Sequence, residues 1–139
     1  MFFTHEILFD TALPVQFLDI TDRVREICKR SEIANGTVTI FTRHTTSAIT
    51  INENCERLQE DMQKLLHGLV PHETYRHDVE TVDGRPNARS HLMSLLLSTS
   101  EMVPLVGGKL VLGTWQSIFF VELDGPRQKR KVLVSILGE

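Results

Sequence analysis

The first candidate for chemistry is the polar segment His44-Thr45-Thr46-Ser47, which is followed closely by Asn52-Glu53-Asn54. Hydroxyl groups, amide groups and free backbone N–H groups at the start of a helix suit oxyanions such as phosphate. A purely structural interpretation is also open, because threonine favours strands and asparagine often caps a helix. The segment is therefore a candidate anion site, with the structural alternative left open.

Two further histidines lie later in the chain. His77-Asp78 falls in an irregular stretch, where a histidine beside an acid could be a metal ligand, a general base or a solvated loop residue. Asn87 and His91 are four residues apart and so share one face of an expected helix, where His91 could equally be a hydrogen-bonded core residue. Together with His44, the two histidines could form a metal site completed by a carboxylate or water. The spacing matches no zinc-finger or H-E-x-x-H pattern, so this metal hypothesis is weak from spacing alone.

The C-terminal third adds Gly113-Thr114-Trp115-Gln116, Glu122 and the basic run 127–131. In an expected strand over 114–123 both faces are largely apolar, so this strand should be central and Glu122 needs a partner, a metal or a proton. Gln116 and Glu122 would lie about 20 Å apart along such a strand. Either only one of them serves a small-ligand site, or two subunits contribute. The basic run is either a solvated hairpin end or a guide for an anionic substrate.

The elements expected to position these residues form one domain over 1–139. Alternating apolar residues predict strands at 2–10, 15–19, 37–42, 47–51, 102–106, 109–113, 114–123 and 131–137. Helical spacing predicts helices from about residue 21 to before Asn35, over 54–68, and from Pro86 through the Leu92–Leu96 stripe. The expected class is α+β, a mainly antiparallel sheet or sandwich packed with about three helices.

Composition excludes several classes. The chain has 139 residues, 41% of them hydrophobic, and a formal net charge of −3, so it is globular and has no overall basic field for nucleic acid or acidic membranes. No apolar run reaches the roughly 18 residues of a membrane helix. The N-terminal residues lack the pattern of a secretory signal, so Cys28 and Cys55 are expected to be thiols in a cytoplasmic protein.

In order and spacing, the chain resembles the YjbQ-like family, also called the secondary thiamine-phosphate synthase family. The matching segments are 44–54, 75–77, 87–92, 112–116, 122 with 124–127, and 138–139. The resemblance runs over nearly the whole chain. It implies a compact α+β fold, a cytoplasmic homotrimer and a weak thiamine-phosphate synthase activity.

The lead hypothesis from this resemblance is an enzyme that joins an aminopyrimidine methyl diphosphate to a thiazole phosphate and releases pyrophosphate. A divalent ion, Mg²⁺ or Zn²⁺, would assist the leaving group. His44, His77 and His91 are the candidate metal or catalytic residues, with Glu53 or Glu122 as the spare carboxylate. The candidate substrate- or anion-binding residues are Thr45, Thr46, Asn52, Asn87, Thr114 and Gln116. The alternatives are a non-catalytic metal- or anion-binding trimer and a metal-dependent phosphohydrolase.

Overall fold

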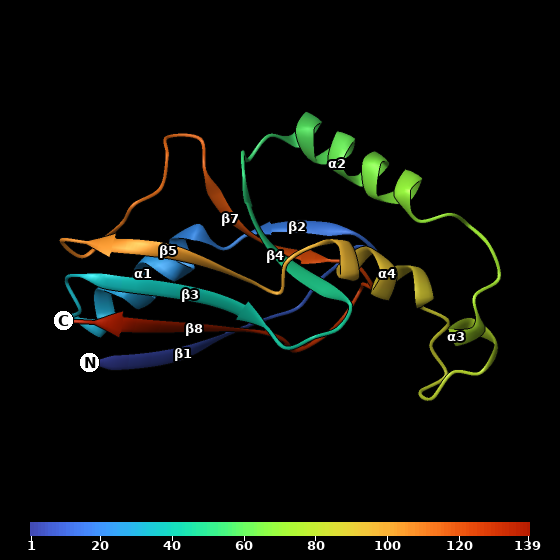
Figure 1. Ribbon diagram of the computed structural model, residues 1–139, viewed down its shortest axis with the longest axis horizontal. Coiled ribbons are helices and arrows are strands. Elements are labelled where there is room, and N and C mark those ends of the chain that lie inside the picture. The colour runs from blue at the N-terminus through green and yellow to red at the C-terminus, as the bar shows by residue number, and fades with distance from the viewer.

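The computed structural model describes residues 1–139 as eight strands and four helices (Figure 1). The strands are β1 (Phe2–Phe9), β2 (Gln16–Asp19), β3 (Gly36–Thr42), β4 (Ser47–Asn52), β5 (Ser100–Val106), β6 (Lys109–Leu110), β7 (Ser117–Glu122) and β8 (Arg130–Gly138). The helices are α1 (Thr21–Ser31), α2 (Glu56–Leu69), α3 (Arg76–Val79) and α4 (Ala88–Leu96).

The strands form two sheets, and every neighbouring pair is antiparallel. The larger sheet has the order β1-β8-β3-β5-β6, and the smaller has the order β2-β7-β4. The predicted α+β sandwich is therefore confirmed. The helix beyond the expected three is α3, a single turn within a stretch that the sequence predicts to be irregular.

The smaller sheet is the middle layer of the molecule, because β7 buries both of its faces. Ile118 and Phe120 face the main core, which the larger sheet and α1 complete. Phe119 and Val121 face a second core, to which α2 and α4 contribute. The sequence prediction that this strand is central is thus confirmed, and its continuous apolar run follows from burial on both sides.

Helix α2 lies on the outside of this second core (Figure 1) and is only lightly anchored. Of its apolar stripe only Leu66 is buried, whereas Leu65 and Leu69 are 62% and 56% exposed. No helix of the structure is long and apolar enough to cross a membrane.

Two predicted strands are shorter than expected. The strand expected over 114–123 covers only 117–122, and the one over 109–113 covers only 109–110. The reason is local. The side-chain Oε1 of Gln116 accepts a hydrogen bond of 2.8 Å from the backbone N–H of Gly113, which closes a turn where a strand would have continued. Gln116 therefore does not lie on the β7 face.

Candidate functional site

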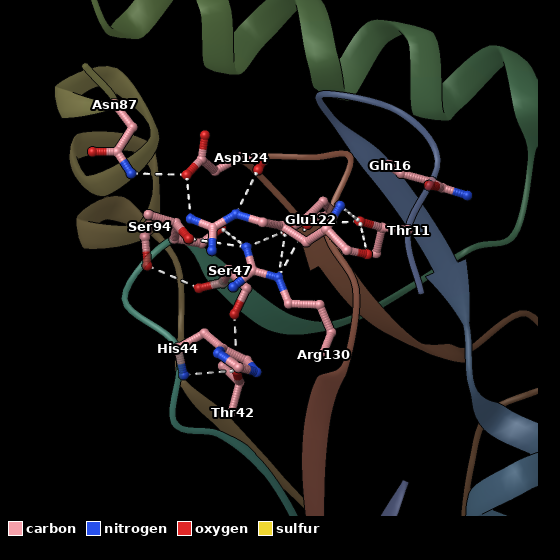
Figure 2. Close-up of polar contacts among 12 residues, drawn as sticks. Thr11, Gln16, Thr42, His44, Ser47, Asn87, Ser94, Glu122, Asp124 and Arg130 are labelled. Carbon is pink, nitrogen blue, oxygen red and sulfur yellow. Dashed lines mark hydrogen bonds and ion pairs between the residues drawn. The ribbon is translucent and has the colours of Figure 1, made fainter. Parts of the chain in front are cut away.

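A buried ion pair joins the two sheets at one end of β7. The guanidinium of Arg130, at the start of β8, donates to both carboxylate oxygens of Glu122, at 2.5 to 3.1 Å (Figure 2). The side chains are 3% and 0% exposed. The Thr11 hydroxyl donates to Glu122 at 2.8 Å, and Arg130 Nη2 donates to Thr46 Oγ1 at 2.9 Å. Such a pair is stable in a core only when further hydrogen bonds accompany it, and here Thr11 and Thr46 supply them.

Asp124, two residues after Glu122, anchors a second cation. Its Oδ2 accepts hydrogen bonds from Arg127 Nη2 at 2.7 Å, from Asn87 Nδ2 at 2.8 Å and from Arg85 Nε at 3.3 Å. Burial alone would raise the pKa of Asp124, but the hydrogen bonds from Asn87, Arg127 and Arg85 outweigh it and hold the pKa below its ordinary value. Asp124 is therefore a carboxylate that only accepts hydrogen bonds.

His44 lies in the connection between β3 and β4. Its Nε2 accepts a hydrogen bond of 3.0 Å from the backbone N–H of Lys131. Burial, with the charge of Arg130 as the next contribution, holds the pKa of His44 below its ordinary value of 6.5. The imidazole is thus neutral at pH 7, and because Nε2 is an acceptor, the proton is on Nδ1. His44 can donate one hydrogen bond from Nδ1 to a ligand.

His77 and His91 lie next to each other. Their ring centroids are 4.9 Å apart with an edge-to-face geometry, and His77 Nε2 is 2.8 Å from Asn87 Oδ1. His77 is on α3 and His91 on α4, so the short helix that the sequence does not predict brings the first histidine to the second. The structure thus brings the predicted pair Asn87 and His91 together with His77.

A polar cavity of about 290 Å³ lies where these groups meet, and no apolar residue lines it. We call it the polar cavity. Its lining residues are Arg43, His44, Thr45, Thr46, Asp83, Asn87, His91, Arg127 and Arg130. Five of the predicted site residues are among them.

A second cavity of about 560 Å³ adjoins the polar cavity and shares four of its residues. It adds the apolar side chains Phe41, Leu95 and Leu97, and we call it the mixed cavity. His44 and His91 are among the shared residues. One ligand could therefore place an anionic group among the guanidinium groups and an apolar ring beside Phe41.

The other predicted residues lie elsewhere. Ser47 pairs with Glu122 at one end of the smaller sheet, whereas Asn52 pairs with Ser117 at the other. Five residue steps separate these ends by about 17 Å. Within one chain, the predicted residues Asn52, Glu53, Thr114 and Gln116 therefore do not reach the polar cavity. They could serve it only from a neighbouring copy.

Arg127 and Arg130 are functional candidates that the sequence reasoning undervalues as part of a basic run. A buried acid in the central strand is the signal that could have found Arg130, since Glu122 needs a cation. Arg127 pairs instead with Asp124. Lys129 adopts a left-handed conformation with φ of 57°. The neighbouring Arg130 is buried, while Lys131 remains exposed.

The three histidines do not form one metal-ligand set. No group of three or more His, Cys, Asp or Glu side chains is arranged so that it could hold a metal ion. His44 Nε2 faces an N–H group, and His77 Nε2 faces an amide oxygen. A metal at these residues of a single chain therefore does not fit, and we derive no step through one.

Comparisons with known proteins match this chain over nearly its whole length. The family model described as "UPF0047 protein YjbQ-like" matches residues 5–139. A UPF0047 protein of Methanothermobacter thermautotrophicus is 46% identical over 138 residues, covering 99% of this chain and 93% of that protein. The UPF0047 protein YugU of Bacillus subtilis is 37% identical and covers 88% and 90%.

Solved structures agree with the fold. A YbjQ-like protein of unknown function from Sulfolobus solfataricus P2 superposes with a TM-score of 0.94 at 39% identity, covering 100% of this chain and 99% of that one. A hypothetical protein from Aeropyrum pernix K1 gives a TM-score of 0.89 at 38% identity, with 98% of each chain covered.

Replacing Glu122 with glutamine is expected to lower the free energy of unfolding by roughly 3 kcal/mol, because the buried guanidinium of Arg130 is left without its counter-charge. Urea unfolding measures the loss. The control Asp22→Asn breaks the Asp22–Arg25 pair, whose side chains are 94% and 57% exposed, and should change stability by less than about 0.5 kcal/mol. Similar losses in both variants would contradict the role of the buried pair.

Acidification is expected to destabilise the protein through His44. The pKa is lower in the folded chain than the ordinary 6.5, so the unfolded chain takes up the proton first as pH falls. The stability that His44 contributes is complete above pH 6.5 and declines down to its lowered pKa. The contribution of His44 is the difference in unfolding free energy between wild type and His44→Gln, measured over this pH range. If that difference does not change with pH, the expected role of His44 is refuted.

Proposed function

We propose that this chain, which belongs to the UPF0047 family of YjbQ-like proteins, binds a phosphorylated small molecule in the polar cavity and acts on it as an enzyme. The observation that carries the proposal is the lining of that cavity: three guanidinium groups, two threonine hydroxyls, two histidines, the Asn87 amide and one carboxylate, Asp83, with no apolar residue. Guanidinium groups bind phosphate oxygens through charge-assisted hydrogen bonds, which are stronger than hydrogen bonds between neutral groups.

The donors of the polar cavity are fixed in direction. Arg130 is held by Glu122, Arg127 by Asp124 and Arg43 by Glu6, the last at 2.8 Å. His44 adds the Nδ1–H donor that its contact with Lys131 leaves available. Donors that are already oriented stabilise charge that develops on a leaving group without reorganising during the reaction. This supports a reaction in which a phosphate or diphosphate group leaves.

The specific reaction that we propose joins an aminopyrimidine methyl diphosphate to a thiazole phosphate. The bond between the methylene carbon and the diphosphate oxygen breaks, a bond from that carbon to the thiazole ring nitrogen forms, and pyrophosphate leaves with the electron pair. The polar cavity would hold the diphosphate, and Phe41, Leu95 and Leu97 of the mixed cavity would contact a ring. The choice of this reaction rests on the family resemblance of the motifs.

Binding and turnover separate this proposal from its alternatives. Arg127→Gln should weaken the binding of inorganic pyrophosphate at least about tenfold, because a charged hydrogen-bond donor contributes roughly 1.5 kcal/mol or more. Calorimetry measures the change. Arg25→Gln, the same charge change outside the polar cavity, should leave the affinity as in wild type. Equal affinities in all three proteins would contradict the assignment of the polar cavity.

The wild-type protein and the variant His91→Ala are then given both phosphorylated substrates, with and without Mg²⁺, and thiamine phosphate is measured. The wild type should form more thiamine phosphate than His91→Ala. No excess would end the synthase proposal. Phosphate release from either substrate alone would favour a phosphohydrolase, and pyrophosphate binding without any turnover would favour a binding protein.

We further propose that the chain assembles as a homotrimer. Large apolar side chains are exposed on two helices, Leu65 and Leu69 on α2 and Leu95 and Leu96 on α4, and Trp115 is 73% exposed. Patches of this kind mark interaction surfaces. An assembly would also offer a way for Gln116 of one copy to approach the polar cavity of another.

Light scattering on the purified protein should give three times the chain mass of 15.8 kDa. The double variant Leu65→Ser and Leu69→Ser should shift the protein towards monomer, because exposed apolar area contributes roughly 25 cal/mol per Å² when it is buried. The matched variant Val82→Ser, on an exposed loop residue, should keep the wild-type mass. A monomeric wild type would refute the trimer.

A further inference from the structure

The side-chain amide of Asn87 lies between a carboxylate and an imidazole. Its Nδ2 is 2.8 Å from Asp124 Oδ2, and its Oδ1 is 2.8 Å from His77 Nε2. Asn87 is only 9% exposed, so water does not compete freely for these contacts. The chain of contacts runs from the end of β7 through the residue before α4 to α3, and connects elements that lie far apart in sequence (Figure 2 shows the Asn87–Asp124 contact).

Each contact fixes the direction of the next. An ionised carboxylate only accepts hydrogen bonds, so the NH₂ end of the Asn87 amide faces Asp124. The amide oxygen then faces His77, and because this oxygen also only accepts, the proton of a neutral His77 is on Nε2. The lone pair of His77 is therefore on Nδ1. This order contrasts with His44, whose proton is on Nδ1.

We propose that Asp124 and Asn87 are positioning residues, which fix His77 as the Nε2–H tautomer and so keep its Nδ1 available as a hydrogen-bond or proton acceptor. His77 does not line the polar cavity. It lines a cavity of about 360 Å³ that shares His91 with the polar cavity. The donor histidine, His44, therefore belongs to the polar cavity, and the acceptor histidine, His77, to the cavity on the other side of His91. The chemical class that such an acceptor takes is a ligand N–H or O–H group.

Neighbouring contacts hold both ends of this chain in place. Arg127 and Arg85 restrain the Asp124 carboxylate, at 2.7 and 3.3 Å. Asp78, next to His77, accepts a hydrogen bond of 2.9 Å from the backbone N–H of Ala88 and so ties α3 to the start of α4. The inference goes beyond the proposed function, because it holds for any reaction that uses the site.

The test is the tautomer of His77 in the whole chain, read from two-bond ¹H–¹⁵N correlation spectra recorded under conditions in which the ring is neutral. The His77 signals are assigned by their loss in His77→Gln. Wild type should show one tautomer, Nε2–H. Asp124→Ala releases the Asn87 amide, so the Nδ1–H fraction should rise several-fold and the Nε2 proton should exchange faster with water.

Two matched variants separate the relay from a general effect on folding. Asp124→Asn keeps an acceptor oxygen and should restore the wild-type tautomer. Arg85→Ala removes another contact of Asp124 but leaves the amide held, and should also match wild type. If Asp124→Ala does not fold, Asn87→Ala carries the same expectation of mixed tautomers. The proposal would be overturned if His77 of the wild type showed mixed tautomers or the Nδ1–H tautomer. It would also be overturned if the His77 spectrum of Asp124→Ala were the same as that of the wild type. Pyrophosphate affinity is measured separately, so failure here is distinct from failure of the proposed function.

Discussion

The ion pair between Glu122 and Arg130 is the constraint on which the site depends. Two charges removed from water are costly, and the pair is stable only because Thr11 and Thr46 complete its hydrogen bonds. Glu122 belongs to the smaller sheet and Arg130 to the larger, so the pair also fixes how the two layers meet. The polar cavity lies at this junction, and the direction in which Arg130 faces it is therefore set by the packing of the core.

Asp124 also pairs with an arginine, two residues after Glu122 and just beyond the end of β7. It restrains Arg127 as Glu122 restrains Arg130, but it is less buried and has a third partner in Asn87. Both carboxylates therefore orient an arginine of the polar cavity, and the second also reaches the imidazole of His77 through Asn87. One short segment, Glu122-Leu123-Asp124, thus orients two of the three cavity arginines and, through Asn87, the ring of His77.

Sequence patterns predicted most of the fold because burial follows their periodicity. The double-sided apolar run of β7 indicated its central place, and alternation located β1, β3 and β8. For the site, the pattern singled out His44, Asn87 and His91, which the fold brings to one cavity. It misplaced Gln116, because one side-chain bond to Gly113 ends the strand early. It undervalued Arg130, because no local pattern shows that a basic residue beside two lysines is the counter-charge of an acid in the core.

The pairing of every cavity arginine with a carboxylate affects how a ligand would arrive. Each cavity arginine is paired with a carboxylate: Arg43 with Glu6, Arg127 with Asp124 and Arg130 with Glu122. The opposite charges of each pair largely cancel at a distance, and salt screens what is left beyond about 8 Å. With a formal net charge of −3, the chain as a whole does not attract anions over long range. Encounter would be governed by ordinary diffusion, and discrimination among anions would arise only once their oxygens are within hydrogen-bonding reach of the guanidinium groups.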